Sequence, residues 1–475
     1  MSLVLIKLRG GIMKPLRKQG IIIFSILALV LAACGGDTTE ETTVEETTPE
    51  VVETLDSPAV TTASGVETGV GVTSDPCPEA IGGIPTGADQ SKGCIYLGML
   101  NDYTGPYAAA GPALETAQRG FWLWANSAGG VGDYSVAIVE GTDTGYNPQR
   151  HLEAYNAQKE NVAALAMSLG TVQTLFILDE MDKDNMVAAP MSWYSGWSYK
   201  SVDKGLVVEF GSAYCADGMN AVDWALANLP VDIKTIGIMG GAGDYGSDWA
   251  AGVKYAAERN GLTVAWEYTP PSTEFDVAQA VGLMITQPVD AYFPAVVPSQ
   301  MAQVAGGAAQ QGVTPIAMLA APAYNDAFVQ EGFALKGLFE SGAIYTMAWV
   351  APYEYQSNAH ATMRATFASM GIDSASSFLV AGWSSQYHLK GVLEAAIKGG
   401  DLTRAGIRRA AANVYVESDG MMLTRELGQD RADKESFINI PDGSIASGVK
   451  MLASNYVGPS AESYDFTQGP CFASG

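Results

Sequence analysis

The strongest constraint on the fold is an alternation of short apolar runs with segments of helical periodicity, which begins at Cys94 and continues past Leu319. Such alternation is typical of α/β proteins whose parallel sheets are covered by helices on both faces. It comes in two successive sets, so we predict two Rossmann-like lobes with parallel sheets. The predicted strands are Cys94–Leu100, Tyr134–Glu140, Val162–Met167 and Met186–Ala189 in the first set, and Thr235–Met239, Leu262–Tyr268, Ala291–Ala295 and Pro315–Leu319 in the second.

Helices are predicted between these strands. Asn147 and Pro148, for example, provide an N-cap and a proline at the first helical position. A strand from Gly337 to Thr346 is expected to cross between the lobes, and short strands are expected in the tail. The predicted helices are Pro112–Asn126, 147–161, one from Thr171, Ala213–Asn228, Ser247–Arg259, Asp276–Ile285, Gln300–Gln310, 355–370, 375–399 and 403–413.

The N-terminal segment has the features of an export signal rather than of a folded domain. The stretch from Met1 to Gly20 holds five basic residues and no acid, and the apolar run Ile21–Leu31 follows it. This run is about half of the ~20 residues that a spanning helix needs. A basic stretch, a short apolar core and a small-residue cleavage site predict a signal peptide over residues 1–33. Met13 is an alternative start.

The end of this signal, Leu31-Ala-Ala-Cys34, resembles the lipobox of bacterial lipoproteins. The resemblance implies cleavage before Cys34 and a diacylglycerol group on its sulfur, which together with a further acyl chain anchors a protein firmly. An ordinary signal peptide with a chance cysteine is the alternative. We therefore expect an extracytoplasmic chain, lipid-anchored to the cell membrane at the cell surface or in the periplasm.

The segment that follows Cys34 is strongly acidic. From Gly35 to Asp75 it has no Lys, Arg or aromatic residue, and like charges extend such a chain. We predict that residues 34–75 are a lipidated cysteine and a disordered tether. The rest exceeds one ordinary core, which favours two lobes. Their predicted bounds are 76–213 plus 346–415 for lobe 1, and 214–345 plus 416–475 for lobe 2.

The whole chain carries a formal net charge of −25, with 51 acidic and 26 basic residues. This argues against nucleic acid or anionic lipid head groups as partners. Four cysteines remain after Cys34, an even number that indicates two disulfides outside the cytoplasm. Four cysteines allow three pairings, and unpaired thiols are the alternative. A local Cys77–Cys94 bond would close the entry to the domain and leave Cys215 and Cys471 to pin the C-terminal tail.

Five segments share their order and spacing with one known family. They are Ile95–Pro112, which contains Thr104-Gly105-Pro106, then Asn126–Val131, Ala166–Thr174, Val187–Trp193 and Gly237–Trp249, with its Tyr-Gly pair. Behind a lipobox, this set resembles the type I periplasmic binding proteins, in the branched-chain amino acid and amide branch of importer receptors. The resemblance covers about residues 94–415.

This resemblance implies two lobes joined by a three-strand hinge, with crossovers near 212–214, 344–346 and 415–417. Ligands in open α/β sheets bind beyond the carboxyl ends of the strands, so the expected site is the cleft between the lobes. A monomer would capture a small organic solute there, without a cofactor. It would deliver the solute to an ABC importer made of two permease subunits and paired ATPases.

The family likeness also implies the site residues. The loop with Ser168, Gly170 and Thr171 would hold a ligand carboxylate, because helix starts favour anions; simple capping of the helix is the alternative. Ser192, Trp193 and Tyr194 would supply a polar contact and an aromatic wall, unless they are ordinary packing residues. The remaining candidates are Tyr103, Thr104 and Tyr107 in the first loop and Tyr245 from the second lobe.

One departure concerns the ligand. Amino acid receptors place an acid after a second-lobe strand to pair with the ligand's ammonium group, but Ala320–Tyr324 has none before Asp326. An unpaired buried ammonium is costly. A plain α-amino acid is therefore disfavoured unless Asp102 or Asp244 takes this role. A small carboxylate, an amide or an aromatic acid fits as well.

The sequence does not favour an enzyme. It has three histidines, none close to another, and no Gly-x-Ser-x-Gly elbow. Zinc-ligand spacing and a calcium loop are absent too, so no metal is expected. A ligand-sensing subunit of a signalling system and an extracytoplasmic hydrolase are the alternatives to an importer receptor.

Overall fold

A computed structural model describes residues 60–61, 65–241, 243, 245–271, 274–423, 425–428 and 433–473. The predicted signal peptide (1–33) and Cys34 lie outside the described residues. Within the described ranges, no helix combines the length and apolar character that a membrane crossing requires.

The first sheet has the long strand β6 (Gly93–Asn101) at its centre. All its neighbours except the short β3 run parallel to it: β7 and β9 return through helices, and β8 follows β7 directly after a short break. The sheet order is β10-β9-β6-β3, with β7 and β8 also paired to β6. The other strands are β3 (Val72–Thr73), β7 (Tyr134–Ile138), β8 (Thr142–Asp143), β9 (Ala164–Leu169) and β10 (Ala188–Met191).

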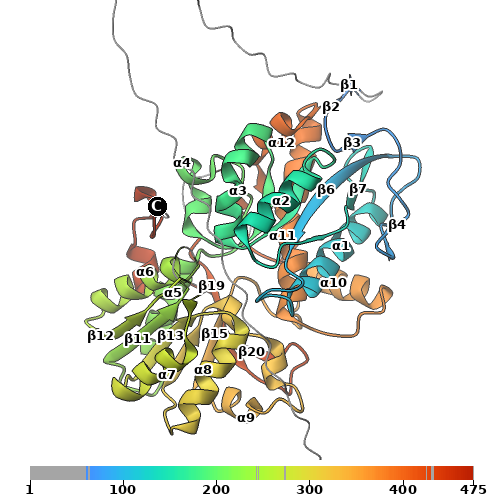
Figure 1. The fold of residues 1–475 in the computed structure, drawn as a ribbon. Coiled ribbons are helices and arrows are strands. Elements are labelled where there is room, and N and C mark those ends of the chain that lie inside the picture. Colours follow the sequence, from blue (N-terminus) through green and yellow to red (C-terminus); the bar gives the residue numbers. More distant parts are fainter. Residues whose placement is uncertain are drawn as a thin grey trace, which may run out of the picture. The chain divides into compact units, whose positions relative to one another are not determined.

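Helices from two distant parts of the chain cover this sheet. The orange helices α10 to α12 lie with the blue and teal elements of the first lobe (Figure 1). At the contact between α1 and α11, the indole Nε1 of Trp122 donates to Gln386 Oε1 at 2.9 Å, and Phe121 packs edge-on against Trp383. These helices are α1 (Gly111–Ser127), α2 (Pro148–Gln158), α3 (Thr171–Asp184), α10 (Asn358–Ser369), α11 (Ser377–Lys398) and α12 (Arg404–Ala411).

The second sheet has the order β12-β11-β13-β14-β15-β19-β20. Its first five strands are parallel, and the last two are antiparallel additions from the C-terminal tail. The prediction of two lobes with parallel-dominated sheets is confirmed. The strands are β11 (Thr235–Gly240), β12 (Thr263–Tyr268), β13 (Ala291–Ala295), β14 (Ile316–Leu319), β15 (Ile344–Ala348), β19 (Ser436–Pro441) and β20 (Val449–Tyr456), and the main helices are α5 (Tyr214–Asn228), α6 (Tyr245–Arg259), α7 (Val277–Thr286) and α8 (Pro298–Gln310).

The chain crosses between the sheets three times. The first crossover precedes α5, where Ala213 N donates to Asp433 O at 3.3 Å in the third crossover. The third crossover was expected at 415–417, and this is wrong. Strand β17 (Tyr415–Val416) forms a hairpin with β18 (Arg425–Glu426) and packs on α11, so the chain leaves the first lobe only afterwards.

The second crossover also lies later than expected. Residues 336–339 form the short helix α9 (Lys336–Phe339) rather than the start of a strand, and β15 lies entirely in the second sheet. The predicted strand Gly337–Thr346 is therefore wrong at its start, and the predicted lobe boundary at 346 falls inside β15. The crossover itself follows β15 and includes Trp349.

The predicted tether reaches too far. Strand β2 (Glu67–Thr68) pairs with β16 (Asp401–Leu402), β3 pairs with β6, and Val66 is buried, so residues 65–75 belong to the folded unit. The carbonyl of Gly71, at φ +78°, accepts the backbone N–H of Tyr96 at 2.7 Å. A Cβ at Gly71 would collide with the backbone of Ala163, so this close approach requires glycine. Apolar burial and hydrogen bonds between strands order this segment, although its sequence has neither helical periodicity nor an aromatic residue.

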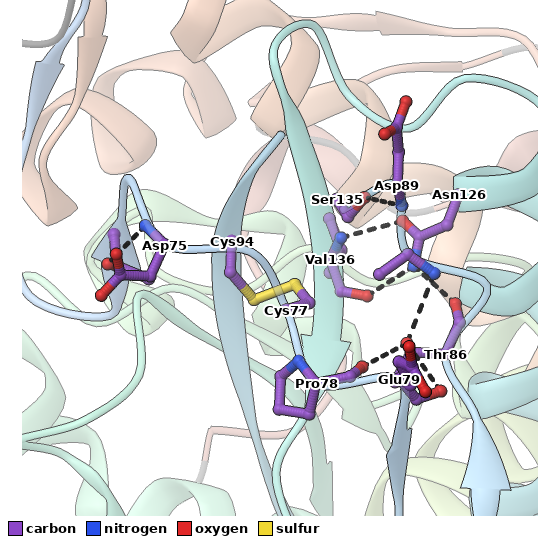
Figure 2. The surroundings of a disulfide bond; sticks show 12 residues. Asp75, Cys77, Pro78, Glu79, Thr86, Asp89, Cys94, Asn126, Ser135 and Val136 are labelled. Carbon is purple, nitrogen blue, oxygen red and sulfur yellow. Dashed lines mark hydrogen bonds between the residues drawn. A yellow bond between two sulfur atoms is a disulfide. The ribbon is translucent and has the colours of Figure 1, made fainter. Parts of the chain in front are cut away.

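Two disulfides join the four cysteines of the folded unit. Cys77 pairs with Cys94 of β6, and Cys215 of α5 pairs with Cys471. Figure 2 shows the first bond beside a local network, in which the amide of Asn126 donates to the carbonyl groups of Thr86 and Val136. The pairing that the sequence favoured is confirmed.

Candidate ligand-binding site

A cavity lies at the carboxyl ends of the first-lobe strands and is bordered by residues of both lobes. We call it the aromatic cavity. It encloses about 450 Å³ of empty space, including its mouth. Among the described residues, no charged side chain lines it. Its lining residues are Tyr107, Ala110, Leu114, Tyr146, Leu169, Met191, Trp193, Tyr214, Tyr245, Pro322, Trp349, Phe378 and Ala381.

The first-lobe wall shows how strand alternation selects the lining. Leu169 and Met191 end β9 and β10 and line the cavity. Successive side chains of a strand point to opposite faces, so Ser168 points away. Its hydroxyl bonds to His151 Nε2 at 2.9 Å and to Thr174 Oγ1 at 2.7 Å. Burial lowers the pKa of His151 to about 3, so this imidazole is neutral and structural.

The loop that was predicted to bind a ligand carboxylate lies behind the side chains that line the cavity. Thr171 Oγ1 and Ser192 Oγ hydrogen-bond to one another, and Ser192 Oγ also accepts the Trp197 indole Nε1–H at 2.9 Å. Gly170, at φ +100°, begins α3 and donates its N–H to Met191 O at 3.3 Å. Gly170, Thr171 and Ser192 are not among the lining residues. The geometry favours the capping role that was the alternative for Gly170 and Thr171.

Trp193 forms the centre of the aromatic wall. Its ring stacks on Trp349, with ring centroids 3.2 Å apart and planes 6° apart, and Phe210 and Tyr214 pack edge-on against it. The buried Nε1 of Trp193 has no hydrogen-bond partner in the described structure. This leaves a donor available to a ligand acceptor. Tyr245 of α6 joins the wall from the second lobe through Tyr214, at 4.9 Å between ring centroids.

Tyr194, the next residue, points the other way. It is buried in a separate cluster, where its ring packs edge-on against Trp197 and its hydroxyl donates to Phe472 O at 2.7 Å. It does not line the cavity, so its predicted role in the aromatic wall is not supported and packing is its role here.

The first loop contributes Tyr107 alone of its three candidates. Asp102 is buried, and its carboxylate accepts the backbone N–H groups of Thr104, Gly105 and Tyr107, which holds the loop and places Tyr107 against Tyr146. The Tyr103 hydroxyl donates to Glu115, and burial raises the pKa of this tyrosine. Thr104 is exposed and donates to Asp143 at 2.7 Å. Tyr103 and Thr104 lie outside the lining.

A second cavity adjoins the first, and we call it the hinge cavity because the second crossover forms much of its wall. It encloses about 560 Å³ of empty space, including its mouth, and no charged side chain among the described residues lines it. Trp349, Phe378 and Ala381 border both cavities. The lining residues are Ala321, Tyr324, Thr346, Met347, Ala348, Trp349, Val350, Ala351, Pro352, Ser377, Phe378, Val380, Ala381, Asn439, Ser447 and Val449.

The segment Ala320–Tyr324, which has no acid to pair with a ligand ammonium group, borders both cavities. Pro322 borders the aromatic cavity, and Ala321 and Tyr324 border the hinge cavity, where an ammonium-binding acid would have to lie. Asp326 borders neither; its carboxylate accepts from Ser376 at 3.2 Å, and burial raises its pKa. Asp102 is committed to its own loop, and Asp244 lies outside the described residues.

Away from the cavities, the lobes are joined by polar contacts. Asp248 of α6 accepts the N–H of Ser195 at 3.0 Å and its hydroxyl at 2.6 Å. Asp217 of α5 accepts the hydroxyl of Ser212 from the first crossover and that of Ser436, the first residue of β19 in its own lobe. Burial raises the pKa of Asp217 to about 7, although the two serines and Trp349 oppose the change.

Sequence reasoning missed Tyr146, Tyr214, Trp349 and Phe378. They come from four distant parts of the chain, so no local spacing joins them. Trp349 directly follows the observed strand β15, but the predicted strand ended at Thr346, three residues earlier, so this signal was missed.

Three solved structures match the fold over most of their length. A fatty acid ABC transporter substrate-binding protein from Thermomonospora curvata has 25% identity and a TM-score of 0.74, covering 85% of this chain and 97% of its own. A branched-chain amino acid ABC transporter protein from Thermus thermophilus with bound valine has 12% identity and a TM-score of 0.65, covering 78% and 98%. A solute-binding protein from R. palustris in complex with 4-hydroxybenzoate has 15% identity and a TM-score of 0.64, covering 77% and 98%.

A comparison with curated protein sequences finds no match. The family model described as "Periplasmic binding protein" matches residues 94–436, most of the chain. The matched family consists of extracytoplasmic solute-binding proteins rather than enzymes. With its two α/β lobes around an uncharged interlobe cavity, this chain belongs to the periplasmic binding protein family.

Proposed function

We propose that this protein captures an organic acid with an apolar or aromatic body, of the fatty acid class, in the aromatic cavity. The observation that carries this proposal is the lining itself, which is aromatic and aliphatic and includes no charged side chain among the described residues. An apolar body gains free energy by leaving water for such a lining, at roughly 25 cal/mol per Å². The similarity to a fatty acid ABC transporter substrate-binding protein, at 25% identity, supports the same class.

The acid group needs hydrogen-bond donors rather than a cation. The unpartnered Nε1–H of Trp193 is such a donor. An ammonium group would find no carboxylate in the described lining and would carry the cost of an unpaired buried charge. The lining thus favours a monocarboxylate over an α-amino acid.

Binding is coupled to closure of the lobes. A ligand that touches Trp193 in one lobe and Tyr245 in the other favours the closed state, because it makes both contacts only there. The closed form is what the permease of an ABC importer would recognise. We further propose a monomeric lipoprotein whose signal peptide (1–33) is removed and whose Cys34 is acylated.

The substrate class can be tested by thermal unfolding of the purified full chain carrying Cys34→Ser, which keeps lipid off this position. Octanoate, decanoate and 4-hydroxybenzoate are the test ligands, with valine, leucine and acetamide as comparison ligands. A ligand at a hundred times its dissociation constant adds about 2.7 kcal/mol of stability. We expect the acids to raise the melting temperature and valine to leave it unchanged. Stabilisation by valine alone would refute the proposed ligand class.

Lipidation has a separate test. Cells that express the wild-type chain and Cys34→Ser are given radiolabelled palmitate. Label on the wild-type chain and none on the variant is expected, whereas label on both would place the lipid elsewhere.

A further inference from the structure

Under the proposed function a short acid binds in the aromatic cavity, which leaves the adjoining hinge cavity without a role. We propose that the hinge cavity is a second chamber of the binding site, which takes the far end of an elongated acid whose apolar chain carries a hydroxyl group there. This inference rests on the proposed function and specifies its ligand further.

The two cavities are separated by a thin partition. Trp349, Phe378 and Ala381 border both of them, and Ala381 offers only a methyl group at this position. A polymethylene chain can therefore pass beside Ala381, between the rings of Trp349 and Phe378, with small side-chain movements. A compact ligand such as an amino acid cannot reach both cavities.

The position of the partition depends on both lobes. Phe378 lies in the first turn of α11, whose N-cap residue Ser376 accepts the Phe378 N–H at 3.2 Å. The Ser376 hydroxyl in turn donates to Asp326 of the second lobe. Closure of the lobes thus fixes the position of the Phe378 ring, which separates the two chambers.

The polar groups of the hinge cavity show where a ligand hydroxyl would bind. Three of them have protein partners: Tyr324 donates to Gly448 O at 2.7 Å, Ser447 to Glu354 at 2.6 Å, and Thr346 to Met347 O at 3.0 Å. Apart from the Trp349 indole, Asn439 is the buried exception in the described lining. Its side chain is 3% exposed, and its Oδ1 has no partner.

An unsatisfied buried amide destabilises the protein, and a ligand that completes its hydrogen bonds removes this cost. A hydroxyl group both donates and accepts, so it satisfies the amide of Asn439 in either orientation. A carboxylate fits poorly there, because no cation or unpartnered N–H lines this chamber in the described structure apart from the shared Trp349 indole. The acid end therefore lies in the aromatic cavity, at Trp193.

The test measures dissociation constants for a series of acids with the Cys34→Ser full chain. The series contains hexanoate, dodecanoate and hexadecanoate, together with 12-hydroxydodecanoate and 16-hydroxyhexadecanoate. Each additional buried methylene should tighten binding about fourfold until the second chamber is filled. The terminal hydroxyl should tighten binding by about a further fivefold to tenfold.

Two variants localise these gains. Ala321→Phe fills the hinge cavity and should remove the gain from chain length while hexanoate binds within about twofold of wild type. Asn439→Leu should remove the preference for the hydroxylated acids. The matched controls are Ala361→Phe and Asn413→Leu at exposed positions, which should bind all acids as the wild type does. If Ala321→Phe fails to fold, Val449→Phe fills the same chamber from another wall.

The outcomes separate this inference from the proposed function. If hexanoate binds but affinity stops rising beyond it, or if Ala321→Phe leaves dodecanoate binding unchanged, the second chamber is refuted and the proposed function stands. A hydroxyl preference that survives in Asn439→Leu refutes the role of Asn439. If no acid of any length binds, both proposals fall.

Discussion

The two lobes meet in two chemically different regions. On the hinge side, directional links hold them: Asp248 accepts from Ser195, Asp217 accepts from Ser212 of the first crossover, and the tail, which a disulfide joins to α5, donates the Cys471 N–H to Ser195. At the aromatic cavity they meet through aromatic side chains, such as the edge-on contact of Trp193 with Tyr214. Hydrogen bonds fix geometry, whereas apolar contacts are non-directional and can be exchanged for contacts with a ligand. This difference indicates that the lobes rotate about the polar region, and that they separate at the aromatic cavity when the site opens.

The largest expected effect comes from the residue that joins both regions. Trp349 stacks on Trp193, borders both cavities and faces Asp217. Trp349→Ala should cost about 3–5 kcal/mol of unfolding free energy, because it leaves a large hole. It should also weaken acid binding at least about tenfold, because the shared wall is lost. Urea unfolding and titration calorimetry measure the two effects.

The control for this variant is Trp124→Ala in α1, where the ring packs on Trp383 away from both cavities. It should lose stability and keep its ligand affinity. Equal losses of affinity in both variants would mean that Trp349 acts only through the general stability of the fold.

The disulfide to the tail should have the next largest effect. The bond between Cys215 and Cys471 links residues 256 positions apart. A double Cys215→Ser, Cys471→Ser variant should lose about 2–4 kcal/mol of stability, because the unfolded chain gains freedom. Its affinity for acids should change little, since the bond lies on the hinge side. A fall in affinity without a fall in melting temperature would contradict the division into two regions.

The buried carboxyl of the hinge should make stability depend on pH. Burial raises the pKa of Asp217 from 3.8 to about 7, so the folded protein keeps a proton that the unfolded chain releases between these values. Its stabilising contribution is therefore present below about pH 4 and is lost as the pH rises through 7. The slope reaches at most about 1.4 kcal/mol per pH unit.

Asp217→Asn tests this directly, because the amide oxygen can still accept from Ser212 and Ser436. The variant should gain stability relative to wild type as the pH is raised from 5 to 8, as measured by urea unfolding. Parallel pH curves for the two proteins would show that Asp217 does not titrate in this range.

The smallest expected effect concerns a single donor in the aromatic region. Trp193→Phe keeps an aromatic ring against Trp349 and removes the unpartnered Nε1–H. Affinity for acids should fall about fivefold, or about 1 kcal/mol, while affinity for the corresponding primary alcohols changes less. Equal losses for acids and alcohols would assign Trp193 a packing role alone.

The strands of the second lobe could be predicted well from the sequence. The run Ala291–Ala295 matches β13, and Thr235–Met239 differs from β11 by one residue. Parallel strands that are buried on both faces appear in the sequence as continuous apolar runs, so they can be predicted from the local sequence. The tail strands β19 and β20 are antiparallel and paired with distant segments, so their place in the sheet had no local signal.

The site was predictable to the level of the loop but not of the side chain. The predicted loops after β9 and β10 border the aromatic cavity, yet a step of one residue along a strand reverses the side chain. This is why Leu169 and Met191 line the cavity while Ser168 and Ser192 point into the core. Of the predicted residues, Tyr107, Trp193 and Tyr245 line the aromatic cavity, whereas Trp349 and Phe378 reach it through long-range packing that sequence spacing cannot encode.

Strands β2 and β3 have a mechanical consequence for a protein anchored at its N-terminus, as we propose. Both strands belong to the first lobe, and Thr73 of β3 lies opposite Cys94, which the disulfide links to Cys77. A pulling force from the membrane anchor would act on β3 and on the Cys77–Cys94 disulfide. It would pass from there into β6, the central strand of the first sheet. The second lobe is not directly attached to the anchor, so it can move relative to the first lobe while the first lobe stays at the membrane.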